Sequence, residues 1–235
     1  MSDPYWSNVT LAMHMDGVNN STTFTDLKGH SVTPYGDAKI STTQSKFGGA
    51  SAYFDGSGDY LSTPNLISDF GTGNFTFESF VYLNNSNGNA LFSYFNQVST
   101  SPRILGYIST TQVIFDFNLN GGGSGNYTVI GNYIGATNQW LHVAITRSAN
   151  VVYLFANGVL LNSGSFPVNI NWNAPFKIGA FDTSAPAYNL YFNGYIDDLR
   201  ITKGVARYTS NFTPPTQAFP DSDVATNTSS MFLVF

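Results

Sequence analysis

The sequence contains no cysteine and a single glutamate, Glu78. The absence of cysteine excludes disulfide bonds and thiolate-bound metal ions. Only nine residues are lysine or arginine, and they form no cluster such as a nucleic-acid-binding face requires. No apolar run approaches the roughly 18 residues of a membrane-spanning helix, and the first residues lack the basic and apolar regions of a secretory signal. We therefore expect neither a nucleic-acid partner nor insertion into a membrane.

What the chain does contain is typical of short strands joined by turns. Of its 235 residues, 16% are aromatic and 22 are glycine, whereas only 10% are charged. Helices favour alanine, leucine, glutamate and lysine, whereas strands favour aromatic and β-branched residues. The length suits one large domain. Composition therefore predicts an all-β fold.

Residues 139–163 show the clearest local pattern. Side chains of residues 140–147 alternate between two sets, which is the period of a strand with two different faces. Asn157-Gly158 separates two apolar runs, and a type I′ turn needs positive φ at both central residues. These features predict a three-stranded antiparallel meander. So apolar a meander needs a second sheet over one face, and the spacing of the strands indicates an antiparallel β-sandwich or a barrel.

The pattern of short strands continues along the chain without an internal repeat or domain boundary. We expect an N-terminal arm at residues 1–8, one domain at 9–220 and a C-terminal tail at 221–235. The tail ends in an apolar run that we expect to dock on this domain or on a neighbouring subunit. This run consists of Met231, Phe232, Leu233, Val234 and Phe235.

Three stretches, residues 9–17, 48–61 and 194–208, carry a resemblance to a known family. Together with the meander around Trp140, and in this order, they are similar to the concanavalin A-like/laminin G-like jelly roll. The resemblance spans roughly residues 9–220 and implies two curved antiparallel sheets, with the first and last strands side by side. Many members of this family carry a calcium ion and bind glycans, some are glycosidases, and others only make protein contacts. The family therefore indicates the fold better than the function.

The end of the domain resembles a narrower group. Arg200-Ile-Thr-Lys-Gly-Val-Ala-Arg-Tyr208, followed by Phe212-Thr-Pro-Pro215, is similar to domains common in bacteriophage structural proteins and in some bacterial surface proteins. The resemblance implies a location at the surface of a virion. Its partners there would be other virion proteins or copies of this chain.

Catalytic motifs are missing. A retaining glycosidase needs two carboxyl groups about 5 Å apart, and the only glutamate, Glu78, lacks the spacing of the catalytic branch of the family. We expect Glu78 to point outward from a half-buried strand. The histidines, His14, His30 and His142, occur without the Gly-x-Ser-x-Gly motif of a serine hydrolase. We therefore expect a protein that is not an enzyme, with a polysaccharide hydrolase as a distant alternative.

Three aspartates are candidates for a calcium site: Asp16, Asp197 and Asp198. Strand alternation would turn one of Asp197 and Asp198 inward, and a buried carboxylate needs a cation or several N–H donors. The resemblance places Asp16 near this pair. Calcium takes six to eight oxygen ligands, and backbone carbonyl groups could complete the shell. The alternative is that these aspartates cap turns or pair with Arg200 or Lys203.

Carbohydrate binding usually combines an exposed aromatic ring with amide and carboxylate side chains. Trp172, in Asn-Trp-Asn, is the best candidate, and Tyr127 and Tyr188 also lie in or near loops rich in asparagine. The alternative is that these rings fill the core and rim of the sandwich.

We derive two main hypotheses of function. The first is a virion structural protein, either a capsid decoration or a knob displayed on a tail, with weak adhesion to cell-surface glycans. The second is a lectin-like carbohydrate-binding protein or the receptor-binding domain of a tail fibre.

Overall fold

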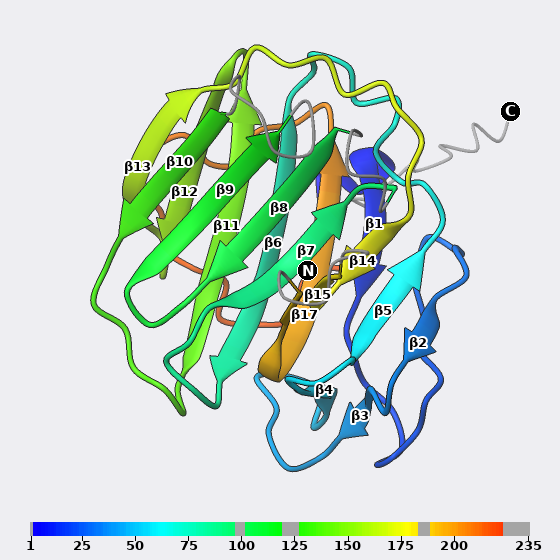
Figure 1. Cartoon of the computed structure of the whole chain (residues 1–235). Helices are drawn as coiled ribbons and strands as arrows, with labels where there is room; N and C mark the ends of the chain where they lie inside the picture. Colours follow the sequence, from blue (N-terminus) through cyan, green and yellow to red (C-terminus); the bar gives the residue numbers. More distant parts are fainter. Residues whose placement is uncertain (1, 97–101, 119–126, 183–188, 223–235) are drawn as a thin grey trace, which may run out of the picture.

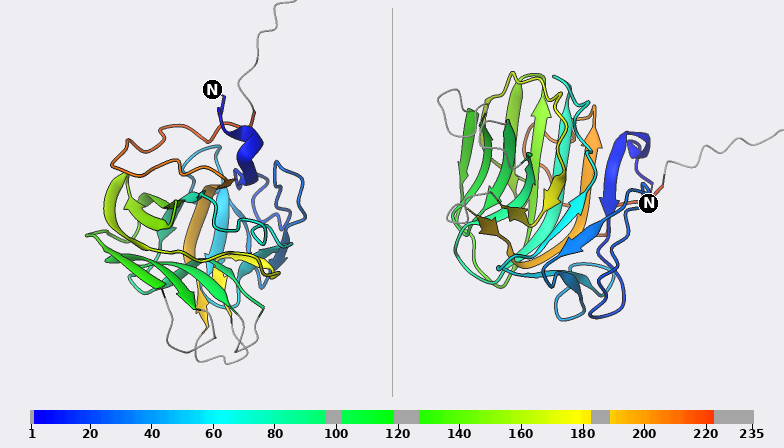
Figure 2. Two further views of the ribbon diagram at one scale, coloured as in Figure 1. Left: turned by 90° about the horizontal axis from the view of Figure 1, so that it is seen from above. Right: turned by 45° about the vertical axis from the view of Figure 1, so that its right-hand side comes forward.

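A computed structural model of the protein describes residues 2–96, 102–118, 127–182 and 189–222. In this part of the chain the only helical element is a short 3-10 turn, η1 (Trp6–Asn8), and none of the helical structure could cross a membrane. Two large antiparallel sheets pack face to face (Figures 1 and 2). The predicted all-β sandwich is confirmed.

The first sheet has eight strands in the order β13-β12-β11-β6-β17-β4-β3, and β1 also pairs with β17. The first and last strands are therefore neighbours, as the resemblance implied. The strands of this sheet are β1 (Val9–Met13), β3 (Lys39–Ser41), β4 (Ser51–Asp55), β6 (Phe75–Leu83), β11 (Trp140–Ser148), β12 (Val151–Ala156), β13 (Val159–Ser165) and β17 (Asn193–Lys203).

The second sheet has seven strands in the order β10-β9-β8-β7-β14-β5-β2. A separate hairpin of β15 (Ala180–Phe181) and β16 (Leu190–Tyr191) accompanies it. The strands of the second sheet are β2 (Thr33–Tyr35), β5 (Tyr60–Thr63), β7 (Asn89–Tyr94), β8 (Arg103–Ile108), β9 (Gln112–Asn118), β10 (Tyr127–Asn132) and β14 (Phe176–Ile178).

The predicted meander is present as β11, β12 and β13. Asn157 and Gly158 form the turn between β12 and β13, with φ values of 47° and 76°. On β11, Val143 and Ile145 point into the core between the sheets. Trp140 and His142 lie on the opposite, outer face of the eight-stranded sheet. The alternation read from the sequence thus gives the correct face for each residue of this strand.

The last described segment, residues 204–222, crosses the outer face of the eight-stranded sheet, and we call it the strap (Figure 2). Thr76 and Thr146 of the sheet donate hydrogen bonds to the strap carbonyls of Val205 and Tyr208, at 3.0 and 2.5 Å. At its end, the carbonyl of Ser222 accepts a hydrogen bond of 2.9 Å from the N–H of Asp3. The strap and the N-terminal segment therefore lie side by side.

Residues 2–8 of the predicted N-terminal arm pack against the domain. Asp3 is only 2% exposed, and its carboxylate binds two arginines beneath the strap. The packing therefore does not change at Val9, where we expected the boundary between arm and domain. The apolar run Met231–Phe235 lies outside the described residues.

Candidate functional site

Glu78 lies on the outer face of β6, where the strap covers it completely. It points outward from β6, as predicted, but the strand is not half-buried there, because Glu78 is 0% exposed. Arg200 donates two hydrogen bonds to one carboxylate oxygen, at 3.0 and 2.8 Å, and the hydroxyl of Tyr208 donates to the other at 2.9 Å. Burial alone would raise the pKa of Glu78, but Arg200, His142 and Arg207 outweigh it and hold the pKa at about 2.

This arrangement is unsuited to acid catalysis. A general acid must carry a proton near neutral pH and reach its substrate, whereas Glu78 is ionised and sealed from solvent. The one described carboxylate that joins this network, Asp3, is held by Arg200 at 2.8 Å and Arg207 at 2.7 Å. The network is therefore structural.

Asp197 and Asp198 lie at a β-bulge that strand periodicity did not reveal. The pairing of β17 with β6 shifts between Asp197 and Arg200, and Asp198 has a φ of 49°. Because of this shift, Asp197 and Arg200 both lie on the outer face, whereas Ile196 and Leu199 enter the core. The prediction that one aspartate points inward is wrong, since the bulge keeps both carboxylates out of the core.

The two aspartates have different partners. Asp198 bonds to Nδ1 of His14 at 2.6 Å and accepts the N–H of Phe219 at 2.5 Å. Asp197 is 0% exposed, and one of its oxygens accepts the N–H groups of Lys46 and Phe47, at 2.7 and 3.1 Å. Its other oxygen, Oδ1, has no hydrogen-bond partner among the described residues.

Burial raises the pKa of Asp197 to about 7, although the two N–H bonds act in the opposite direction. The negative charges of Asp198 and Asp16 also raise it, so Asp16 approaches the pair closely enough to interact with it. Asp198 is nevertheless occupied by His14 and Phe219. The unpartnered oxygen of Asp197 suits a cation, but the expected set of three aspartate ligands is not assembled. Calcium at Asp16, Asp197 and Asp198 stays a prediction.

Among the described residues, a different trio brings its carboxylates together. Oxygen atoms of Asp37, Asp55 and Asp59 lie within 4.8 Å of one another. Both oxygens of the buried Asp59 accept backbone N–H groups, from Asp37 at 2.7 Å and from Asp55 at 2.9 Å. Asp59 therefore fixes the turn around Gly36 and Gly58, and these contacts alone explain its position.

The aromatic residues predicted to bind carbohydrate lie close to the core. Trp172 is half-buried, with its ring centre 5.5 Å from that of Tyr94 and 5.8 Å from that of Phe117. Tyr127 is also half-buried and contacts Phe117 and Phe166. Tyr188 lies outside the described residues. The first two rings thus have the packing of rim residues, and no sugar-binding role has been tested for them.

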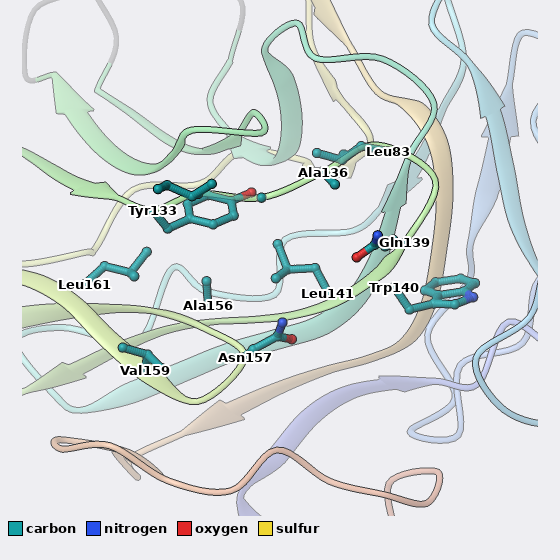
Figure 3. A pocket seen from close by; sticks show the side chains of 12 residues that line it. Leu83, Tyr133, Ala136, Gln139, Trp140, Leu141, Ala156, Asn157, Val159 and Leu161 are labelled. Atoms are coloured by element: carbon teal, nitrogen blue, oxygen red, sulfur yellow. The ribbon is translucent and has the colours of Figure 1, made fainter.

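An open cleft lies at one end of the sandwich, beside the first residues of β11. Its volume is about 450 Å³. Tyr133, Leu141, Ala156 and Leu161 surround the hollow, and Gln139 points toward it (Figure 3). Trp140 lies at one end and Asn157 at the hairpin turn. The remaining lining residues are Leu83, Ile134, Gly135, Ala136 and Val159.

The chemistry of the cleft is mixed. Ile134 is fully exposed and Val159 is 54% exposed, so an apolar rim faces water. The hydroxyl of Tyr133 donates to the carbonyl of Ser109 at 2.5 Å, which fixes this ring in place. Oδ1 of Asn157 accepts the N–H of His142 at 3.0 Å, and this bond leaves its amide group toward the cleft side of the turn. A mostly apolar cleft with a few polar groups is a typical binding site for a small ligand.

Sequence reasoning missed this cleft because its residues come from four separate segments. One signal was present: Ile134 is a large aliphatic residue in a loop, between Tyr133 and Gly135. A single exposed apolar residue is common on protein surfaces, so Ile134 is informative only together with Val159 at the rim of the cleft.

The two antiparallel sheets packed face to face define a β-sandwich of the jelly-roll class. The profile of the concanavalin A-like lectin/glucanases superfamily matches residues 55–207, and the chain belongs to this family. Comparison with curated protein sequences gives no match.

Solved structures share the fold at low sequence identity. Domain 4 of AbnA, an extracellular GH43 arabinanase from Geobacillus stearothermophilus solved with arabinotriose, is 20% identical, with a TM-score of 0.61 over 85% of this chain and 94% of that one. The binding domain of botulinum neurotoxin serotype D is 16% identical, with a TM-score of 0.60 over 86% of this chain and 49% of that one. The binding domain of botulinum neurotoxin DC with SialylT is 14% identical, with a TM-score of 0.57 over 92% and 50%. The chain thus spans about half the length of the neurotoxin domains.

Proposed function

We propose that this jelly roll is a non-enzymatic carbohydrate-binding domain whose sugar site is the cleft beside Trp140. The observation that carries the proposal is the combination of an open cleft of about 450 Å³ with two amide side chains, Gln139 and Asn157, and with the indole ring of Trp140 on the outer face beside its end (Figure 3). The complexes of two fold neighbours with arabinotriose and SialylT support it by analogy. The buried, ionised Glu78 supports the absence of glycosidase activity.

Each group would act by ordinary sugar chemistry. The C–H face of a pyranose or furanose ring is apolar and packs on an aromatic ring. Tyr133 offers such a ring beside the hollow, and Trp140 offers one on the outer face next to the end of the cleft (Figure 3). Sugar hydroxyl groups both donate and accept hydrogen bonds, as do the amides of Gln139 and Asn157. The aliphatic floor, with Leu141 and Leu161, would exclude water around these bonds.

The test is a glycan microarray followed by titration calorimetry with the best sugar. We expect W140A to lower affinity at least tenfold, and Q139A to lower it less. Y35A is the matched control, because Tyr35 is an aromatic residue of the other sheet that is 45% exposed and lies outside the cleft. The proposal is wrong if no glycan binds, or if W140A and Y35A have equal effects in variants that melt like the wild type.

We propose further that the domain is displayed on a virion, as a capsid decoration or as a knob on a tail. Two observations support this location: the resemblance of residues 200–215 to phage structural domains, and the apolar run Met231–Phe235 as a contact with other virion proteins or with a second copy. A tail fibre's receptor-binding domain is the alternative, and it would use the same sugar site.

Electron microscopy of native particles labelled with an antibody against this chain would test the location. We expect label on the particle surface, and we expect deletion of Met231–Phe235 to abolish incorporation while sugar binding is retained. Particles without label would contradict the virion proposal and leave the sugar site untouched.

A further inference from the structure

A row of aromatic side chains leads away from the cleft across the outer face of the eight-stranded sheet. Trp140 of β11 pairs with Tyr82 of β6, Tyr82 with Tyr195 of β17, and Tyr195 with Tyr53 of β4. The ring centres are 5.6, 5.6 and 5.0 Å apart along this row. Lys39 of β3 ends it, with Nζ 5.7 Å from the centre of the Tyr53 ring.

Trp140 joins the row to the cleft, because it lines the end of the cleft while its ring points away from the hollow and onto the outer face (Figure 3). Trp140, Tyr82 and Tyr53 are half-buried, so each presents part of its ring to solvent. Tyr195 is only 9% exposed and supports the two rings beside it. The remaining outer face is different, because the strap covers it around Phe80 and Glu78.

We infer that the row is an extension of the sugar site that binds a single, extended, neutral polysaccharide chain running from the cleft to Tyr53. This inference rests on the proposed function. Four adjacent strands about 4.8 Å apart span roughly 15 Å, which is longer than one sugar ring. A monosaccharide would fill only the cleft, whereas a chain of several units would also contact Tyr82 and Tyr53.

The tilt of the rings selects the form of the polysaccharide. Successive planes meet at 60°, 85° and 45°, so the row offers no flat platform. A crystalline polysaccharide presents a flat surface that needs coplanar rings. A single soluble chain can instead twist to pack against one ring after another, as the sheet itself twists.

The negative charge near Tyr53, at the end of the row away from the cleft, disfavours acidic sugars. Asp37, Asp55 and Asp59 lie beside Tyr53, whose pKa is raised first by burial and then by these three carboxylates. Lys39 supplies one positive charge against them. A uronic-acid or sialylated chain would meet net negative charge there, and like charges at short range repel.

The experiment measures binding of two oligosaccharide series by calorimetry. Glucose, cellobiose and cellohexaose, with the corresponding malto- and xylo-oligosaccharides, form the neutral series, and oligogalacturonates form the acidic one. We expect hexasaccharides to bind at least tenfold more tightly than the mono- and disaccharides of a series that binds. We expect oligogalacturonates to bind more weakly than neutral chains of equal length.

Variants of Tyr53 test whether the aromatic row causes the higher affinity for hexasaccharides. Y53A should lower hexasaccharide affinity about two- to tenfold, the usual contribution of one aromatic contact, without changing binding of the short sugar. Y53L keeps apolar volume without the ring, so it should show the same loss even if Y53A folds poorly. Y35A serves again as the control.

The outcomes separate the two proposals. Affinity that is independent of chain length, equal loss for short and long sugars in Y53L, or tighter binding of oligogalacturonates would overturn the extended site while leaving the cleft in place. Absence of binding by every sugar in the array and in both series would instead overturn the proposed function.

Discussion

Two carboxylates on the outer face of the same sheet are both fully buried, yet they differ widely in acidity. Glu78 has a pKa of about 2, whereas Asp197 has a pKa of about 7. Glu78 faces two arginines, whereas the described neighbours of Asp197 offer only two backbone N–H groups. Burial raises both pKa values, and the nearby cations decide the difference.

The outer face of the eight-stranded sheet has one half that the strap covers and one half that it leaves open. In the covered half, the strap supplies Arg207 and Tyr208 and the N-terminal segment supplies Asp3, and these groups bind Glu78 and Arg200. In the open half, the aromatic row and the cleft have no such cover. We infer that the strap completes the fold and that the open half is available for a ligand.

The largest expected effect is the loss of the central cation of the covered half. R200L leaves the buried Glu78 without its two hydrogen bonds from Arg200 and removes one of the two arginines that bind Asp3. Breaking a buried pair in this way costs about 3–5 kcal/mol. Denaturation with urea should show a lower midpoint with a similar slope. Sugar binding by the remaining folded protein should be unchanged, because Arg200 is far from the cleft in sequence and in the sheet register.

The matched control is R103L. Arg103 pairs with Asp116 at 3.6 Å, and both side chains are partly exposed, at 25% and 19%. An exposed pair contributes about 0–1 kcal/mol. Equal losses for R103L and R200L would show that the covered network is no more than an ordinary surface pairing.

Features that depend on one stretch of the sequence could be predicted from it. The faces of β11 follow from strict alternation, and the turn at Asn157-Gly158 follows from the need for positive φ. The bulge at Asp198 could not be predicted in this way, because it depends on the pairing of β17 with β6 rather than on β17 alone. The spacing of Ile196 and Leu199, three residues apart, was the trace of the bulge in the sequence.

The candidate site was harder to predict for the same reason. Trp140, Tyr82, Tyr195 and Tyr53 come from four strands, and only the strand order places them in a row. The burial of Glu78 likewise depends on Tyr208, 130 positions away. Alternation gives the face of a strand, but not the segment that later covers that face. Trp172 was favoured from its local asparagines, which carry no information on the core that it contacts.

A smaller effect is expected where the hairpin turn meets the strap. Gly158 has a φ of +76°, and a Cβ placed there would lie 2.0 Å from the carbonyl oxygen of Phe212. G158A should therefore cost the left-handed conformation, about 1–2 kcal/mol, and a displacement of the strap, about 1–3 kcal/mol. Chemical denaturation measures the sum. Hydrogen exchange should show the strap amides losing protection.

G29A isolates the cost of the left-handed conformation, so the difference between G158A and G29A gives the cost of displacing the strap. Gly29 has a φ of +87°, and no atom lies within 4 Å of its Cβ position. Only the left-handed cost applies there. If both variants lose the same stability, the strap does not resist the added methyl group and its cover over the sheet is loose.

The smallest expected effect concerns the unpaired carboxylate. The pKa of Asp197 is about 7 in the folded state against 3.8 ordinarily, so the folded state holds the proton more tightly. Its contribution to stability is full below about pH 4 and is lost as the pH rises to about 7. D197N should remove this loss and stabilise the protein at pH 8 by about 1–2 kcal/mol, since the new amide N–H finds no acceptor and offsets part of the gain.

The test compares the free energy of unfolding as a function of pH for the wild type and for D197N. This comparison is needed because Asp16 and Asp59 also have raised pKa values, chiefly through burial, and contribute to the slope of the wild-type curve. His14, whose pKa is raised by its bond to Asp198, adds a loss of stability only above its ordinary value of 6.5. The slope between about pH 4 and 7 should therefore become shallower in D197N. Equal slopes for the wild type and D197N would mean that Oδ1 of Asp197 has a partner. Calcium should raise the stability of the wild type at pH 8, and not that of D197N, if a cation is that partner.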